Sequence, residues 1–213
     1  MKQLLPGLFH WSTFHDGIGH DVDSYYITAV EPAVLIDPRI PAEGLEWFDR
    51  RPRPEHVYLT NRHHYRHSDR FEKTFGCKVW CHRDGLHEFK KGQKVAAFTH
   101  GDKLPGGVLA LEVGVLCPEE TALYVPRSGG ILCIGDALMR HGGRLGFVPD
   151  AYMGPDPEGV KRGLCRIFRG LLRRKFDHLL FAHGRPIKGG AKERMRAFLP
   201  PRDERRSGTI MSG

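Results

Sequence analysis

The sequence lacks the features that would place it in a membrane or on a secretory route. No apolar run among its 213 residues approaches the roughly 20 residues that a membrane-spanning helix needs. The N-terminus has no basic segment followed by an apolar one, as a secretory signal would have. Only five cysteines are present, an odd number that does not form a paired framework. We therefore expect a cytoplasmic protein with reduced thiols and no membrane contact.

The composition is that of an ordinary globular domain. Hydrophobic residues make up 40% of the chain, which is enough to bury a full core at this length. Fifteen prolines and 26 glycines indicate many turns. We expect a single domain over residues 1–199 and a flexible C-terminal tail over residues 200–213.

Positive charge is in excess and is concentrated in the C-terminal part of the chain. The net charge of +8 allows attraction to nucleic acid, acidic lipids or anionic substrates, without selecting among them. Much of this charge lies after residue 158, in a predicted helix with Asp156 as its cap, Pro157 at its first position and an apolar stripe at helical spacing. Its other face is basic and consists of Lys161, Arg162, Arg166, Arg169, Arg173 and Arg174. A solvated helix face explains this pattern, and contact with nucleic acid or another acidic partner is the alternative.

Apolar runs separated by turns predict a chain rich in strands. Residues 24–30 and 33–38 read as a hairpin, whereas the glycine-bearing loop 15–21 is expected on the surface, with pocket lining as the alternative. The run 56–60 is followed by a helix that Asp69 or Ser68 caps and Gly76 ends, and then by a strand over 77–81. Further strands are predicted over 113–116, 121–125, 130–134 and 178–182, and a last helix over 191–199.

Three of these strands end in side chains that could bind a ligand. The first leads into a histidine-rich stretch that contains His63, the second into Asp136 and the third into His183. Open α/β sheets place their ligands at the carboxyl ends of strands. Taken separately, each of these residues has an ordinary structural explanation, but together they predict one shared pocket.

The same segments resemble the metallo-β-lactamase fold superfamily, which includes hydrolases of the glyoxalase II type. The resemblance runs along most of residues 5–199 and is carried by the early hairpin, the strand into the histidine stretch, and the runs 131–138 and 179–184. It implies an α/β fold, a four-layer αββα sandwich, with the site at one edge between the two sheets. It also implies a metal centre whose ligands follow the strand that ends at Thr60.

Most of the metal ligands that the resemblance implies are missing from this sequence. The four positions of the family's histidine and aspartate motif fall on Asn61, His63, Tyr65 and Arg66, and only His63 is kept. The loop 116–120, where the family has its next histidine, contains none. Asp136 matches the acidic residue that bridges two metals, and His183 matches the last histidine ligand. The implied metal ligands are therefore His63, Asp136 and His183, three of seven positions.

An arginine in the motif changes what the site can hold. A guanidinium cannot bind a metal and repels a dication, so we expect Arg66 to occupy the space of the second metal and to pair with Asp136. The alternative is that Arg66 points to solvent. A slip of the loop could instead bring in His64, His67 and Asp69 as replacement ligands. Zinc is accordingly expected at low occupancy or not at all.

Three functions remain open at this point. The first is a hydrolase with a degenerate, single-metal or metal-free site, which would cleave an ester or thioester with Asp136, Tyr65 and His64 as catalytic candidates. The second is a non-catalytic relative that binds a small anion through Asn61, Arg62 and Arg66. The third is a nucleic-acid-associated protein that uses the basic helix. Either of the first two predicts a small-molecule substrate or anion as the partner.

Overall fold

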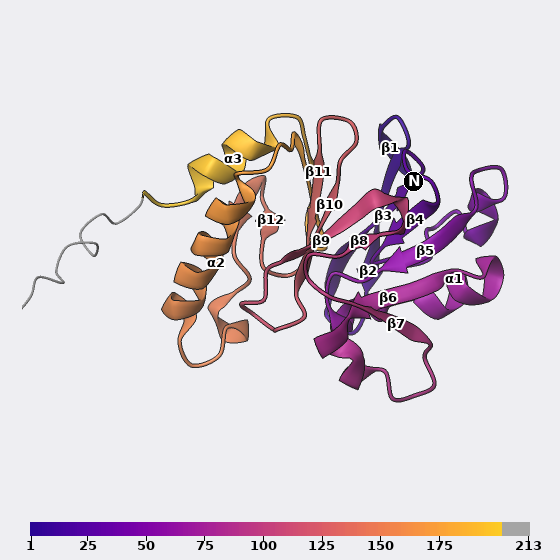
Figure 1. Ribbon diagram of the computed structural model, residues 1–213, viewed down its shortest axis with the longest axis horizontal. Coiled ribbons are helices and arrows are strands. Elements are labelled where there is room, and N and C mark those ends of the chain that lie inside the picture. The colour runs from indigo at the N-terminus through magenta and orange to yellow at the C-terminus, as the bar shows by residue number, and fades with distance from the viewer. Residues whose placement is uncertain (202–213) are drawn as a thin grey trace, which may run out of the picture.

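Two β-sheets pack face to face, and helices cover their outer faces (Figure 1). This arrangement is seen in a computed structural model that describes residues 1–201. The four layers confirm the predicted αββα sandwich. The tail predicted for residues 200–213 lies outside the described residues from residue 202 onward.

The first sheet has seven strands in the order in which they occur along the chain. Strands β1 to β4 are antiparallel neighbours, whereas β4 to β7 run parallel. Helix α1 (Ser68–Phe75) connects β5 to β6, which confirms the predicted βαβ unit. The strands are β1 (Lys2–Leu5), β2 (Leu8–His15), β3 (His20–Ile27), β4 (Ala33–Ile36), β5 (Pro54–Tyr58), β6 (Lys78–His82) and β7 (Val95–Phe98).

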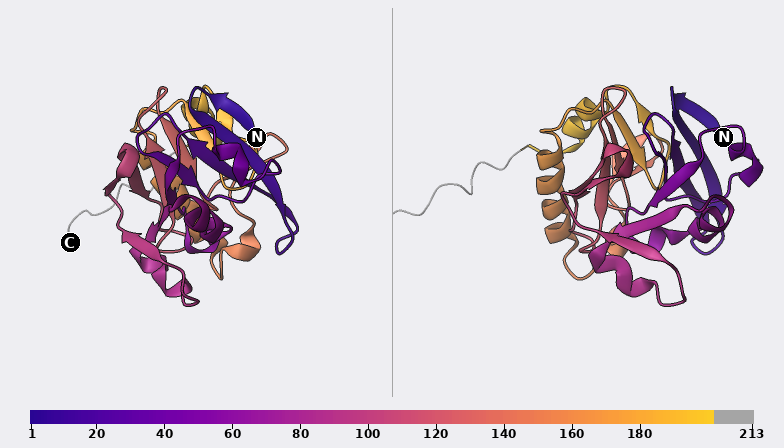
Figure 2. Two further views of the ribbon diagram at one scale, coloured as in Figure 1. Left: turned by 90° about the vertical axis from the view of Figure 1, so that its right-hand side faces the viewer. Right: turned by 45° about the vertical axis from the view of Figure 1, so that its right-hand side comes forward.

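The second sheet has six strands in the order β15-β14-β11-β10-β9-β8. Only β11 and β14 run parallel, so these two strands end at the same edge. Helices α2 (Pro157–Leu171) and α3 (Ala191–Phe198) lie on the side of this sheet that faces away from the first sheet (Figure 2). The strands are β8 (Lys103–Leu104), β9 (Val108–Glu112), β10 (Thr121–Val125), β11 (Ile131–Ile134), β14 (His178–Phe181) and β15 (Ile187–Lys188); β12 (Met139–His141) and β13 (Arg144–Gly146) form a separate hairpin.

The alternation of side chains along the strands creates the layers. In β11, Ile131 and Cys133 face the first sheet, whereas Leu132 and Ile134 pack in the cluster under α2 and α3. The same alternation in β4 divides its side chains between the space between the sheets and the cluster under α1. Because both faces of these strands are buried, they read in the sequence as continuous apolar runs rather than as an alternating pattern.

Local signals predicted most helix ends correctly. Asp156 accepts a hydrogen bond from the Gly159 amide at 2.8 Å and caps α2, and Gly76 ends α1 in the left-handed conformation. The predicted cap of α1 is wrong, because the helix follows His67 with no side-chain cap. The strand predicted over 113–116 is also wrong: the strand is β9, and Gly114, at a φ of 57°, turns the chain away from it.

The early hairpin of residues 24–30 and 33–38 is confirmed as the antiparallel pair β3 and β4. Strand β3 begins earlier than predicted, at His20, and forms with β2 a long arm that ends at Asp16 to Gly19. Within residues 1–201, the structure contains no helix that is long and apolar enough to cross a membrane.

Candidate metal centre

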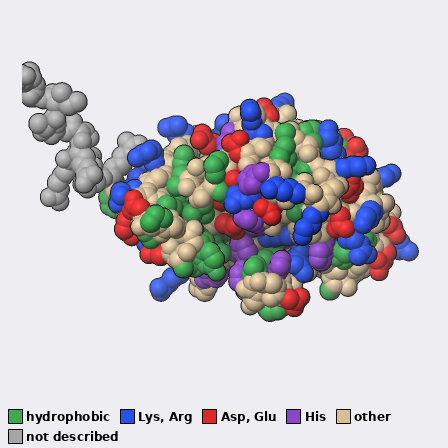
Figure 3. Space-filling view, turned by 90° about the horizontal axis from the view of Figure 1, so that it is seen from below, with side chains coloured by type: hydrophobic (Ala, Val, Ile, Leu, Met, Phe, Trp, Pro, Cys, Tyr) green, Lys and Arg blue, Asp and Glu red, His purple; other side chains and the backbone are tan. Residues whose placement is uncertain are grey.

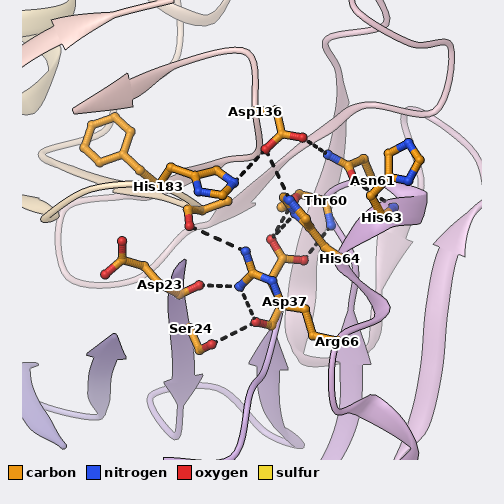
Figure 4. Close-up of polar contacts among 12 residues, drawn as sticks. Asp23, Ser24, Asp37, Thr60, Asn61, His63, His64, Arg66, Asp136 and His183 are labelled. Atoms are coloured by element: carbon orange, nitrogen blue, oxygen red, sulfur yellow. Dashed lines mark hydrogen bonds and ion pairs between the residues drawn. The ribbon is translucent and has the colours of Figure 1, made fainter. Parts of the chain in front are cut away.

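His64, Asp136 and His183 meet where the two sheets adjoin (Figure 4). His64 comes from the first sheet, in a 3-10 turn (Arg62–Tyr65) that follows β5. Asp136 and His183 follow β11 and β14, whose parallel pairing brings both residues to one edge of the second sheet. One ligand atom of each residue lies within 4.8 Å of the other two.

The orientation of His64 is fixed by the buried carboxylate of Asp37. The Nδ1 atom of His64 lies 3.0 Å from Asp37 Oδ2 and 2.8 Å from Thr60 Oγ1. Asp37 also accepts hydrogen bonds from the Thr60 amide at 2.9 Å and the Thr60 hydroxyl at 2.6 Å. The other ring nitrogen, Nε2, is therefore directed at Asp136, whose Oδ1 lies 3.2 Å away.

The two oxygens of Asp136 have different surroundings. Oδ2 accepts a hydrogen bond from the Asn61 side-chain amide at 2.9 Å. Oδ1 lies 3.2 Å from His64 Nε2 and 3.0 Å from His183 Nε2, yet it is buried and accepts no well-directed hydrogen bond from the described residues. Two imidazole nitrogens thus converge on one carboxylate oxygen that accepts no well-directed hydrogen bond from either ring, an arrangement that suits ligands around a shared ion.

The backbone on both sides of His183 is held in place. Its carbonyl accepts a hydrogen bond from the Arg140 amide at 3.1 Å, and the Gly184 amide donates to Asp23 Oδ2 at 2.7 Å. Gly184 has a φ of 107°, and a Cβ there would lie 2.1 Å from the Arg140 oxygen, so only glycine fits. The His183 Nδ1 atom is buried and has no hydrogen-bond partner within residues 1–201.

Burial and neighbouring charges shift the pKa values of the cluster residues in different directions. Burial alone would raise the pKa of Asp136, but the charges of His64 and His183 hold it well below its usual value. Burial would lower the pKa of His64, but Asp136 and Asp37 outweigh it and raise the pKa to about 9. Burial lowers the pKa of His183. Glu120 lies next to the centre, and burial raises its pKa to about 8.

Arg66 lies beside the cluster, and its guanidinium contacts backbone carbonyls rather than a carboxylate. Its Nη1 atom donates to the carbonyl oxygens of Asp23 and Asp37, both at 2.7 Å, and its Nη2 atom lies 3.5 Å from the carbonyl of Ala182 (Figure 4). Within residues 1–201 it makes no ion pair with a carboxylate, so the predicted pair with Asp136 is not formed. The reason is that His64 and His183 already face that carboxylate. The alternative that Arg66 points to solvent is also wrong.

The residues present fit one metal ion and not two. The convergent atoms of His64, Asp136 and His183 supply three ligands, the number that a catalytic zinc site usually takes from the protein. Next to them, the space holds the guanidinium of Arg66, which cannot act as a ligand. The cluster therefore combines Asp136 and His183, which match the family's ligand positions, with His64, which does not.

Other predicted site residues divide between the cavity and the core. Asn61 orients Asp136, while Arg62 and His63 line the cavity beside the cluster. Tyr65 packs against Phe89, with ring centroids 5.6 Å apart, and burial raises its pKa to about 12. The candidate replacement ligands also separate. His67 accepts a hydrogen bond from the Ile40 amide at 3.0 Å and Asp69 lies near Lys73, so of the three only His64 joins the cluster.

A cavity of about 490 Å³ opens onto the cluster. Histidine side chains gather around a hollow on this face of the molecule (Figure 3). Part of its wall is apolar, and Ile18, 48% exposed, and Tyr152, 76% exposed, are the large hydrophobic side chains that it leaves open to solvent. Ile18 shows that the loop 15–21 lines a pocket, the reading that the sequence did not favour. The other lining residues are His20, Asn61, Arg62, His63, Leu116, Cys117, Glu120, Asp136, Met139, His141, Val148, Pro149 and His183.

Comparison with known proteins identifies the fold from structure alone. No protein-family profile matches the sequence, and neither does any curated protein. Among solved structures, a metallo-β-lactamase family protein from Thermus thermophilus aligns with a TM-score of 0.64 and 18% identity, over 92% of this chain and 79% of that one. The chain has the metallo-β-lactamase fold.

Two further structures support this fold. The B3 metallo-β-lactamase BLEG-1 aligns with a TM-score of 0.65 and 18% identity, over 90% of this chain and 98% of that one. A protein solved in a di-iron-bound form aligns with a TM-score of 0.65 and 20% identity, over 87% of this chain and 98% of that one. At such identities the metallo-β-lactamase fold is shared, while activity and metal content have to be argued from the site.

Proposed function

We propose that this chain is a metal-dependent hydrolase that works with a single ion, held by His64, Asp136 and His183. The observation that supports it is the convergence of three ligand atoms within 4.8 Å of one another, two of whose residues, Asp136 and His183, line a cavity large enough for a small molecule. A structural neighbour solved with two iron ions is consistent with a metal at this edge of the fold. When bound, the ion would act as a Lewis acid on water and on a substrate carbonyl, the chemistry of ester or thioester hydrolysis.

The chain's own residues prepare the site in three ways. Asp37 binds one nitrogen of His64, so that the other nitrogen faces Asp136; carboxylates commonly orient metal-binding histidines in this way. Asn61 holds one oxygen of Asp136 and leaves the other oxygen for the ion. Asp23 and Gly184 fix the loop that carries His183. The apolar part of the wall would exclude water from the bound substrate.

The guanidinium groups near the cavity do not favour the alternative of a non-catalytic anion-binding protein. Arg62 lines the cavity but is paired with Glu119, and Arg66 donates to backbone carbonyls. Neither side chain offers its donors freely to an anion, whereas the Asp136 Oδ1 atom of the cluster accepts no hydrogen bond from the described residues. A cytoplasmic location belongs to the same proposal, because all five cysteines are free thiols.

The neighbouring residues His63 and His64 provide a sharp test. Metal-free protein and the variants His64→Ala and His63→Ala should be titrated with zinc, with bound metal measured by elemental analysis after dialysis. We expect one equivalent per chain in the parent and in His63→Ala, and less than a tenth of an equivalent in His64→Ala. Hydrolysis of chromogenic esters and a thioester should follow the bound metal across the three proteins.

Three results would contradict the proposal. Binding of two equivalents would show that Arg66 does not exclude a second ion. Equal loss of zinc in both variants would show that the ligand set is not His64, Asp136 and His183. Metal binding without hydrolysis of any ester or thioester would leave a metal site and overturn the activity.

A further inference from the structure

We propose that the outer face of α2 binds the phosphate backbone of a nucleic acid duplex. The surface consists of four arginines, Arg162, Arg166, Arg169 and Arg173, here called the arginine stripe. Their spacing of four, three and four residues places them on one side of the helix and its last turn. At a rise of about 1.5 Å per residue, the stripe is about 16 Å long. This inference does not depend on the proposed hydrolase activity.

Most of the stripe has no acidic partner in the described part of the chain. Arg166 and Arg173 are exposed and make no ion pair within residues 1–201, and Arg169 donates to the carbonyl of Pro200 at 2.6 Å. Only Arg162 approaches a carboxylate, that of Asp156, at 3.9 Å. By contrast, the adjacent Lys161 lies 2.9 Å from both Asp150 and Glu158. The helix thus neutralises its lysine and leaves its arginines available.

Helix stability does not account for the stripe. Cations near the C-terminus of a helix interact favourably with its dipole, which suits Arg169 and Arg173. Arg162 and Arg166 lie in the first ten residues of α2, where that benefit is absent. Like charges three and four residues apart also repel one another by a few tenths of a kcal/mol per pair. A binding role explains why the repulsion is tolerated.

The surroundings of the stripe favour a polyanionic backbone over a membrane or a single strand. Hollows of about 530 and 870 Å³ flank it, and both are lined by Arg166 and Arg173. The exposed large hydrophobic side chains of the described chain, Phe14, Ile18 and Tyr152, all lie outside it, so it offers nothing to insert into lipid. The nearby Tyr124 is covered by the Arg174 guanidinium at 5.7 Å, so no open ring is available for stacking unpaired bases.

The proposal is tested by the salt dependence of duplex binding. Fluorescence anisotropy with labelled 20-base-pair DNA and RNA duplexes would be measured between 50 and 200 mM KCl for the full chain. The triple variant Arg166→Gln, Arg169→Gln, Arg173→Gln should bind at least tenfold more weakly at 100 mM KCl. The slope of log K against log salt should become shallower by about 2–3 units, since each lost phosphate contact removes about 0.9 for DNA.

Matched variants test whether binding depends on the arginine stripe or only on the net charge of the protein. Lys90→Gln, Lys91→Gln, Lys94→Gln removes the same charge from exposed positions near β7 and should reduce affinity by less than threefold. Replacing the three arginines with lysine should retain most of the slope and guards against a folding artefact. An equal loss in the Lys90 variant would overturn the proposal. Binding to vesicles rich in phosphatidylserine without duplex binding, or tighter binding of a single strand, would also overturn it.

Discussion

The ligand cluster lies beside the backbone carbonyls that bind the Arg66 guanidinium, here called the cradle. The two regions satisfy buried polar groups in opposite ways. In the cluster, side chains face side chains, and the Asp136 Oδ1 and His183 Nδ1 atoms remain without hydrogen bonds. In the cradle, a guanidinium is bound by the backbone carbonyls of Asp23, within β3, and of Asp37 and Ala182, which directly follow β4 and β14. Open ligand atoms can accept an ion, whereas a backbone-bound cation cannot be displaced without disturbing the strands. The proposed single-ion site therefore lies beside a permanent structural cation.

The largest expected effect comes from removing that permanent cation. Arg66→Met should lower the free energy of unfolding of metal-free protein by about 3 kcal/mol, because buried carbonyls lose their donor and nearby Asp37 and Asp136 lose a positive charge. Urea unfolding followed by circular dichroism measures it. The exposed Arg70, changed to Met, is the control and should stay within about 0.5 kcal/mol of the parent.

The same variant also tests whether Arg66 defines the number of ions. If Arg66→Met bound a second zinc ion with no loss of stability, Arg66 would only fill the place of a metal ion and would not stabilise the fold. The comparison between the two regions would then fail. Arg66→Lys is the informative intermediate, since an ammonium retains the charge but cannot donate to the three carbonyls in the same planar arrangement.

A smaller effect is expected from the carboxylate behind His64. Asp37→Asn should weaken zinc binding by about 10–100-fold, because the ring would lose the partner that directs Nε2 at Asp136. A competition titration against a zinc chelator measures the affinity, and Asp69→Asn, on the surface beside Lys73, serves as the matched control. Unchanged affinity would show that His64 is oriented by the backbone of its turn alone.

Asn61→Ala should have a still smaller effect of about tenfold on zinc affinity. The change removes the single hydrogen bond to Asp136 Oδ2, after which the carboxylate can rotate away from the histidines. Because the Asn61 side chain also accepts a hydrogen bond from the His63 amide, the unfolding free energy has to be measured in parallel. A loss of affinity with unchanged stability would assign Asn61 to the centre, and the reverse would assign it to the turn.

Local and periodic features of the fold could be predicted from the sequence, because they depend on neighbours along the chain. The Asp156 cap and the left-handed Gly76 are examples. The positions of Asp136 and His183 could also be predicted, because a residue that follows a buried strand emerges at the edge of a sheet. The strand predicted at 113–116 failed because an apolar run does not reveal where a glycine such as Gly114 turns the chain.

The contacts that complete the centre could not be predicted. Alignment of the motif pointed to His63, but Asn61 caps a 3-10 turn that sends the His64 side chain inward instead. Asp37 reaches His64 across 27 residues, and its strand-end position beside Pro38 reads as an ordinary turn. Arg66 was expected to satisfy a carboxylate, whereas carbonyls from distant strands satisfy it. Such contacts depend on tertiary packing, which a single sequence does not contain.

The smallest predicted effect is a pH dependence that only the cluster should show. The pKa of His64 is raised from 6.5 to about 9, so its contribution to stability is complete below pH 6.5 and is lost as the pH rises through about 9. Glu120, whose pKa is raised to about 8, would weaken the fold over an overlapping range, so the measurement belongs in a Glu120→Gln background. There, metal-free protein should lose at most about 1 kcal/mol between pH 7 and 8, and adding His64→Gln should flatten the curve. Arg66 keeps its charge throughout, so a slope that survives without His64 but disappears with Arg66→Met would reverse the roles assigned to the two regions.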